Sequence, residues 1–104
     1  MSASKKYRVR IQKEAVDELD RLYHHISKEF PTRARSFLKQ LKGKILSLKN
    51  FPSRGSRAKI LEEQDLEIRF IDYKGQLILY TIHEKEVVVL HISGPGQNWM
   101  EVFF

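Results

Sequence analysis

The sequence contains no cysteine and no long run of apolar residues. Without cysteine there is no disulfide, no thiolate metal site and no cysteine nucleophile. No window approaches the ~20 apolar residues that a transmembrane helix needs. The first ten residues, MSASKKYRVR, also lack the apolar core of a secretory signal. We therefore expect a soluble, cytoplasmic protein with no membrane partner.

Carboxylates are scarce in the first half of the chain. Residues 1–57 contain 15 Lys or Arg and 5 Asp or Glu, a net charge of +10, whereas residues 58–104 contain 4 and 8, a net charge of −4. Such asymmetry is typical of a basic face that binds nucleic acid or an acidic protein. It also fits a solvated surface that only keeps the protein soluble, and both interpretations stay open.

Hydrophobic periodicity predicts a single domain that spans residues 1–104. Alternation of apolar and polar residues predicts a first strand at residues 7–11, and spacings of three and four predict an amphipathic helix from Glu14 to Pro31, which ends it. We expect Thr32 to be the N-cap of a second amphipathic helix. Later strands are expected at residues 66–70, 76–83 and 86–93, with a short edge strand at residues 58–61.

The predicted order of elements is β-α-α-β-β-β. The short link between the helices favours antiparallel packing, and such a pair can cover one face of an antiparallel sheet. We therefore expect an α+β fold of two layers, in which the second face of the sheet is left open to bind something.

The histidines are candidates for metal binding or proton transfer. His24 and His25 point about 100° apart on a helix, so they cannot share a metal ion, and we expect no metal site and no cofactor. By strand parity, His83 and His91 can line the open sheet face beside Arg69. These three are candidate catalytic residues, because imidazole exchanges protons near neutral pH. The simpler interpretation is that His83 and His91 are half-buried in the sheet and have no catalytic role.

Basic residues also gather in a loop rich in Gly and Ser after the second helix. Arg54, Arg57 and Lys59 lie there, where backbone N–H groups of the loop could bind an anion. Together with Arg69 and Trp99, they form the set expected to contact a target protein or nucleic acid. A plain turn is the alternative for the loop. For Trp99 and the apolar tail around it, the alternative is packing back onto the core.

A stripe of cations also follows the second predicted helix, opposite its apolar stripe. Arg35, Lys39, Lys42 and Lys49 form this stripe. It is either the wet face of a surface helix or a face that follows the phosphates of a nucleic acid.

In order and spacing, these segments resemble the RelE/ParE superfamily of toxins from bacterial type II toxin–antitoxin modules. The resemblance extends from Tyr7 to Trp99. It rests on residues 16–26, similar to the family's A…DL..I..YI pattern, on FPSRG at residues 51–55, similar to L…P..G, and on ILY at 78–80 and VVVLHI at 87–92, similar to the family's later strands. The long helical hairpin resembles the ParE branch more than the RelE branch.

This resemblance implies a ParE-like toxin that inhibits growth by binding a protein target such as DNA gyrase, and that a cognate antitoxin neutralises. On this interpretation the protein is not an enzyme. The first alternative is a ribosome-dependent mRNA endoribonuclease of the RelE kind, which would use Arg69 with His83 or His91. The second is a non-toxic member that binds its antitoxin or nucleic acid.

Several positions differ from the residues that the family carries at functional sites. Leu77 stands where the RNA-cleaving branch has an arginine, Gln97 where an arginine follows the last strand, and Phe103 where a tyrosine can act. In the ParE-like ending LHGRR.W, Gly94 replaces the histidine, and Trp99 is kept. Leucine cannot bind a phosphate and phenylalanine cannot exchange a proton, so these differences favour binding over catalysis.

Overall fold

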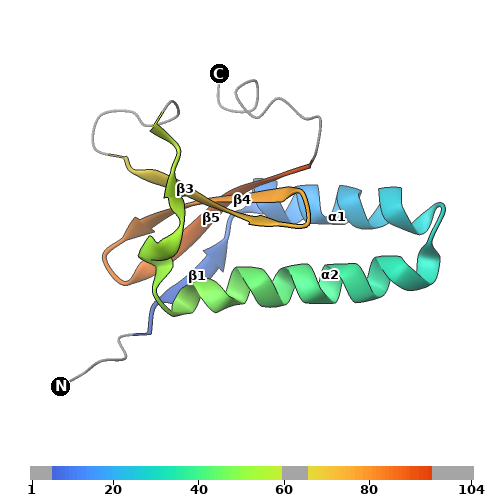
Figure 1. Cartoon of the computed structure of the whole chain (residues 1–104), viewed down its shortest axis with the longest axis horizontal. Helices are drawn as coiled ribbons and strands as arrows, with labels where there is room; N and C mark the ends of the chain where they lie inside the picture. Colours follow the sequence, from blue (N-terminus) through green and yellow to red (C-terminus); the bar gives the residue numbers. More distant parts are fainter. Residues whose placement is uncertain (1–5, 60–65, 95–104) are drawn as a thin grey trace.

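The structure is a computed structural model that describes residues 6–59 and 66–94. Its elements, in chain order (Figure 1), are β1 (Arg8–Ile11), α1 (Lys13–Ser27), α2 (Pro31–Leu46), the 3-10 turns η1 (Ser47–Lys49) and η2 (Pro52–Arg54), β2 (Ser56–Arg57), β3 (Ile68–Tyr73), β4 (Gln76–His83) and β5 (Glu86–Ser93).

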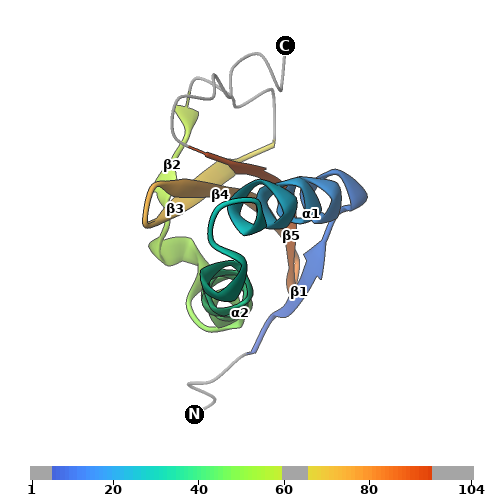
Figure 2. The ribbon, with the colours of Figure 1, turned by 90° about the vertical axis from the view of Figure 1, so that its right-hand side faces the viewer.

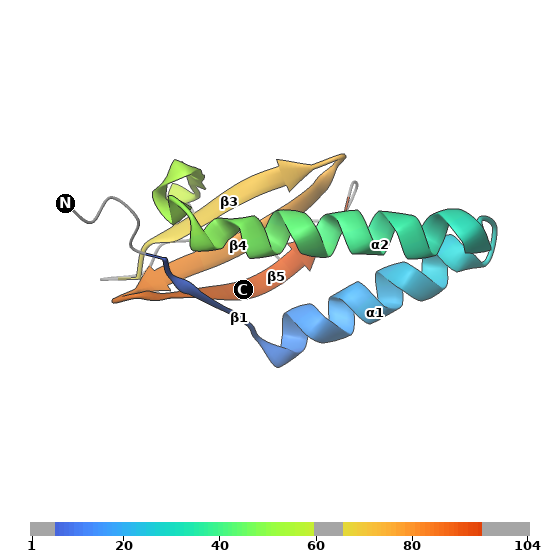
Figure 3. The same ribbon diagram turned by 90° about the horizontal axis from the view of Figure 1, so that it is seen from below.

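The strands form one mixed sheet in the order β1-β5-β4-β3-β2. Strands β2 to β5 pair antiparallel, as predicted for the strands after the helices, whereas β1 joins the edge of β5 in parallel. Both helices lie on the same side of this sheet (Figure 2), and they run side by side across it as an antiparallel hairpin (Figure 3). The predicted two-layer α+β fold is confirmed.

Packing between the helices and the sheet forms the main core. The apolar stripes predicted for the helices are buried, and the sheet contributes side chains of alternating residues. The fully or almost fully buried members are Ala15, Leu19, Leu38, Leu41, Ile45, Leu48, Ile78, Tyr80, Val87, Val89 and Ile92. Because each buried Leu, Ile or Val contributes about 1.5–3 kcal/mol, this layer dominates the stability of the fold.

The turn between the helices differs from the prediction. Pro31 does not end the first helix but is the first residue of α2, and Phe30 rather than Thr32 is its N-cap. Proline suits this position, because N–H groups of the first helical turn have no partner within the helix and its fixed φ is already helical. Helix α1 ends earlier, at Ser27, in a turn where Glu29 and Phe30 N–H donate to Ile26 O.

The sheet face away from the helices is largely apolar. Ala58, Ile68 and Leu79 form a second buried cluster there, with Phe70, Leu77 and Leu90 packed against it. Thr81 is also buried, and its hydroxyl donates to Glu67 O over 2.7 Å. We expected this face to be left open for binding, but its central side chains are buried.

The short strand at the β3 edge of the sheet begins before the predicted residues 58–61. Strand β2 is Ser56–Arg57, which pairs with Phe70 and Arg69 of β3. Ala58 N–H extends the ladder by donating to Ile68 O over 2.8 Å. Residues 60 and 61 lie outside the described residues.

Candidate functional site

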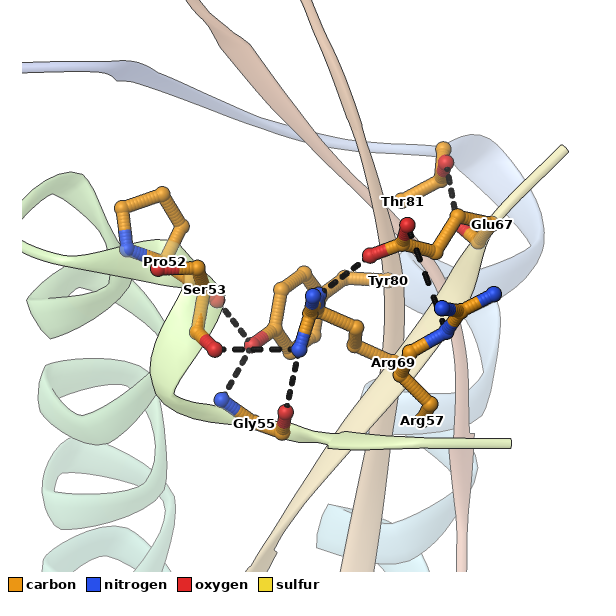
Figure 4. A network of polar contacts seen from close by, with 8 residues as sticks. All are labelled: Pro52, Ser53, Gly55, Arg57, Glu67, Arg69, Tyr80 and Thr81. Atoms are coloured by element: carbon orange, nitrogen blue, oxygen red, sulfur yellow. Dashed lines mark hydrogen bonds and ion pairs between the residues drawn. The ribbon is translucent and has the colours of Figure 1, made fainter. Parts of the chain in front are cut away.

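The loop after α2 is held against the sheet by Gly55 and Tyr80 (Figure 4). The ring of Tyr80 is fully buried, its hydroxyl donates to Pro52 O, and the same oxygen accepts from Gly55 N–H at 3.1 Å. A Cβ at position 55 would collide with this hydroxyl and would lie 2.9 Å from Phe70 O, so only glycine fits. Burial raises the pKa of Tyr80, which keeps the phenol neutral and makes it a structural hydrogen-bonding group.

Arg69 fastens the same loop from β3. Its Nη1 donates to Ser53 O at 3.0 Å and to Gly55 O at 2.7 Å. Its Nε lies 2.6 Å from Glu67 Oε2, at an angle that makes the contact an ion pair rather than an aligned hydrogen bond. Only 19% of the side chain is exposed. The Arg69 guanidinium therefore binds groups of the protein itself. A phosphate would have to compete with two carbonyls and a carboxylate for it.

Arg54 is used in a similar way at the end of α2. Its Nη1 donates to Ser47 O and, over 2.7 Å, to Asn50 O, while Nη2 donates to Ser47 Oγ over 2.6 Å. A cation is well placed there, because the last carbonyl groups of a helix have no intrahelical donor and carry partial negative charge. We call Arg54, Arg69 and Tyr80, with the segment 47–55 that they hold, the loop clamp.

The other two cations of the predicted loop site are exposed, unlike Arg69. Arg57 Nε lies 4.0 Å from Glu67 Oε1, so Glu67 stands between Arg57 and Arg69 (Figure 4). Lys59 is exposed at the end of the described loop. Their role in target or nucleic-acid binding stays a prediction.

His91 is tied to α1 by a residue that the sequence analysis did not single out. Glu18 Oε2 lies 3.1 Å from His91 Nδ1, and Glu18 Oε1 accepts from Ile92 N–H at 2.7 Å. Both side chains are largely buried, at 17% exposed for His91 and 11% for Glu18. Strand β1 pairs with β5 only as far as Val89. Beyond that point, Glu18 takes the place of a strand partner, a role that its position beside the apolar stripe of α1 could have indicated.

The three candidate catalytic residues do not lie on one face. Arg69 is opposite Tyr80 in the ladder, so both side chains project to the helix side. His83 is three residues beyond Tyr80, which places it on the other face and about 10 Å further along the strand. It is exposed in a cleft of about 610 Å³ that includes Tyr7, Arg8 and the turn between β4 and β5. No shared proton-transfer site links Arg69, His83 and His91 in the described structure.

A groove between α1 and α2 combines apolar and cationic side chains. It measures about 740 Å³ and is lined by Ile11, Val16, Leu19, Asp20, Tyr23, Arg35, Leu38, Lys39 and Lys42. Val16 is 48% exposed within it, a large fraction for an apolar residue next to a core. Within the described residues, Arg35, Lys39 and Lys42 have no ion-pair partner, unlike Lys13 of α1, which pairs with Asp17 at 3.0 Å. We call this surface the helix groove.

Some predicted positions fall outside the described residues, namely Trp99, Gln97 and Phe103. Their predicted roles stay predictions. In residues 6–59 and 66–94, no group of three His, Asp or Glu is placed to hold a metal ion. No helix in that part of the chain has the length and apolar character needed to cross a membrane.

Comparison with known proteins gives a family and a fold. A family model for the ParE toxin of the type II toxin–antitoxin system, parDE, matches residues 9–99. A solved structure titled as the chromosomal ParDE toxin–antitoxin system from P. aeruginosa aligns with a TM-score of 0.73 at 17% sequence identity, covering 88% of this chain and 99% of the other. No curated protein sequence matches the chain. With a family match over most of its length, this chain belongs to the ParE toxins of type II toxin–antitoxin systems.

Proposed function

We propose that this toxin binds and inhibits DNA gyrase, and that a cognate antitoxin neutralises it by inserting an acidic amphipathic segment into the helix groove. Membership of the ParE family supports the assignment, and the similar P. aeruginosa structure is one of a toxin–antitoxin system. The observation that carries the antitoxin part is the composition of the helix groove.

The helix groove has the surface that an acidic amphipathic helix or strand would match. Leu19 and Leu38 are buried and form its floor, and Val16 is half exposed beside them. Its rim carries the exposed Arg35, Lys39 and Lys42 and one carboxylate, Asp20. Helix α2 contains five Lys or Arg and no Asp or Glu, so nothing within the helix offsets that charge. An amphipathic partner would bury its apolar face on the floor and place its carboxylates near the rim.

Binding, rather than cleavage, is also supported by how the polar residues are used. Cleavage of RNA needs preorganised cations and a proton-transfer group around one phosphate, and loss of one such donor typically costs 10²–10³ in rate. Arg69 donates to loop carbonyls, Tyr80 is a buried neutral phenol, and His91 is joined to Glu18. Arg69 and Tyr80 hold the same loop, and His91 is fixed at a second place by α1, so each group stabilises the fold.

The target is tested by inducing the chain in cells and with purified components. We expect growth arrest on induction, inhibition of DNA supercoiling by purified gyrase, and no new cuts in cellular mRNA by primer extension. Codon-positioned cuts that disappear in Arg69→Ala would instead support the mRNA endoribonuclease. Induction without any effect on growth would support the non-toxic alternative.

The helix groove is tested by reversing its charge. Arg35→Glu combined with Lys39→Glu should weaken binding of the antitoxin encoded beside the toxin by about 100-fold and abolish rescue of growth, while the variant itself remains toxic. Lys28→Glu with Lys85→Glu is the matched control, because it changes net charge equally at exposed positions outside the groove. Equal loss of antitoxin binding in both pairs would point to a general charge effect and contradict a specific groove.

A further inference from the structure

Phe51 is the most exposed large apolar side chain described in the structure. It is 75% exposed, whereas Leu46, the next in order, is 51% exposed. Its backbone is left-handed, with φ 52° and ψ 59°, a conformation that a bulky L-residue seldom adopts. Such a conformation persists only where the surrounding structure imposes it, and it is often found at contact sites.

The loop clamp imposes this conformation. Before Phe51, Arg54 holds Ser47 O and Asn50 O. After it, Tyr80 holds Pro52 O, and Arg54 N–H donates to Phe51 O over 3.1 Å. The backbone on both sides of Phe51 is therefore fixed while its ring remains in water. An aromatic ring on a rigid backbone loses little conformational entropy on binding, which is the property of a preorganised anchor.

The sequence on either side of Phe51 is cationic and partly aliphatic. Leu46, at the end of α2, is separated from it along the chain only by η1 and Asn50, and Lys49 is exposed between them. From residue 30 to residue 61 the sequence has nine Lys or Arg and no Asp or Glu. Any partner that approaches this end of α2 therefore meets an aromatic ring within a positive field.

We propose that Phe51, with Leu46 and Lys49, which precede it closely in the chain, is the surface by which the toxin contacts its protein target, and that the target supplies an apolar pocket rimmed by carboxylates. This inference rests on the proposed function and specifies which residues make the target contact. A protein fits better than a nucleic acid because Leu46 offers no base-stacking surface and the Arg54 guanidinium is occupied by carbonyls.

This surface adjoins the helix groove but does not coincide with it, because Leu46 lies one helical turn beyond Lys42. The groove is lined by residues up to Lys42 on α2, whereas Phe51 follows the end of that helix in the chain. Mutations should therefore separate target binding from antitoxin binding. Neutralisation requires only that the bound antitoxin extend past the end of α2 far enough to screen Phe51.

The test compares Phe51→Ala with Phe30→Ala, a matched control that removes a ring 48% exposed at the opposite end of α2. With purified gyrase as the probe, Phe51→Ala should lose at least about 30-fold in affinity, the effect expected of an interface hot spot. Growth arrest should be lost as well, with melting temperature and antitoxin binding unchanged. Phe30→Ala should remain as toxic as the wild type.

Other outcomes separate failure of this inference from failure of the proposed function. A toxic wild type with an equally toxic Phe51→Ala overturns the inference alone. A wild type that neither arrests growth nor binds gyrase contradicts the proposed function, and the inference with it. If Phe51→Ala unfolds, Lys49→Glu tests the same surface without changing the strained residue. We expect this variant to bind gyrase at least about 5-fold more weakly, an order-of-magnitude figure for one interfacial charge. Unchanged binding would overturn the inference. A dimer, or DNA binding, that depends on Phe51 would also overturn it.

Discussion

The loop clamp and the helix groove are both rich in arginine and lysine, but they use these cations in opposite ways. In the loop clamp, Arg54 and Arg69 donate to backbone carbonyls and hold the chain on the sheet. In the helix groove, Arg35 and Lys39 line the rim of a groove and have no ion-pair partner among the described residues. The residue types alone do not distinguish the two roles.

The difference comes from the backbone around each cation. The segment after α2 leaves the carbonyls of Asn50, Ser53 and Gly55 outside regular helical hydrogen bonding, and Arg54 and Arg69 donate to these. The middle of α2 has no unpaired carbonyl to offer, so its cations remain available to a partner. A basic residue is therefore a better candidate for binding when it lies mid-helix than when it follows a helix end.

The largest effect should come from Gly55→Ala in the loop clamp. The added methyl group would collide with the Tyr80 hydroxyl and approach Phe70 O, so we expect a loss of about 3 kcal/mol in the free energy of unfolding, measured with urea. Gly43→Ala is the matched control, because its Cβ would meet no atom within 4 Å and it lies inside α2. There we expect a gain of about 1 kcal/mol. A small effect at Gly55 would contradict the close packing of the clamp.

A smaller effect on the free energy of unfolding should distinguish a cation of the loop clamp from a cation of the helix groove. Arg69→Met keeps much of the aliphatic volume but leaves Ser53 O and Gly55 O without their donor and removes the ion pair with Glu67, so we expect a loss of about 2 kcal/mol in unfolding free energy. Lys39→Met, on the rim of the helix groove, should change that free energy by less than about 0.5 kcal/mol. Equal losses in the two variants would remove the distinction between a fastening cation and a binding cation.

Sequence patterns predicted the fold well, because period-2 and period-3.6 patterns report directly on which side chains are buried. They misplaced Pro31, since a proline can begin a helix as readily as end one. They did not predict that β1 pairs with β5 in parallel, because strand order depends on contacts between distant segments.

The candidate site was less predictable than the fold. Strand parity placed His91 on an open face, but the register between β4 and β5 shifts at Leu79 and Tyr80, and Glu18 of α1 contacts the histidine. The role of Arg54 depends on carbonyls that become available only where α2 changes to a 3-10 turn. Neither feature has a simple local signal. The helix groove, in contrast, follows from the cationic stripe on α2, which the sequence does show.

The smallest expected effect concerns the response of the loop clamp to alkaline pH. Burial raises the pKa of Tyr80 above its ordinary value near 10, so the phenol loses its proton more readily in the unfolded chain than in the folded one. The contribution of Tyr80 to the free energy of unfolding is therefore fully present below about pH 10. It decreases as the pH rises from there toward the higher pKa of the folded state. The slope is at most about 1.4 kcal/mol per pH unit for this one group.

Urea unfolding of the wild type and of Tyr80→Phe between pH 8 and 11 measures this slope. The variant should be less stable at pH 8, because Pro52 O and Gly55 N–H lose their partner, but should lose less stability as pH rises. Parallel curves for the two proteins would show that Tyr80 is not the group that couples the clamp to alkaline pH.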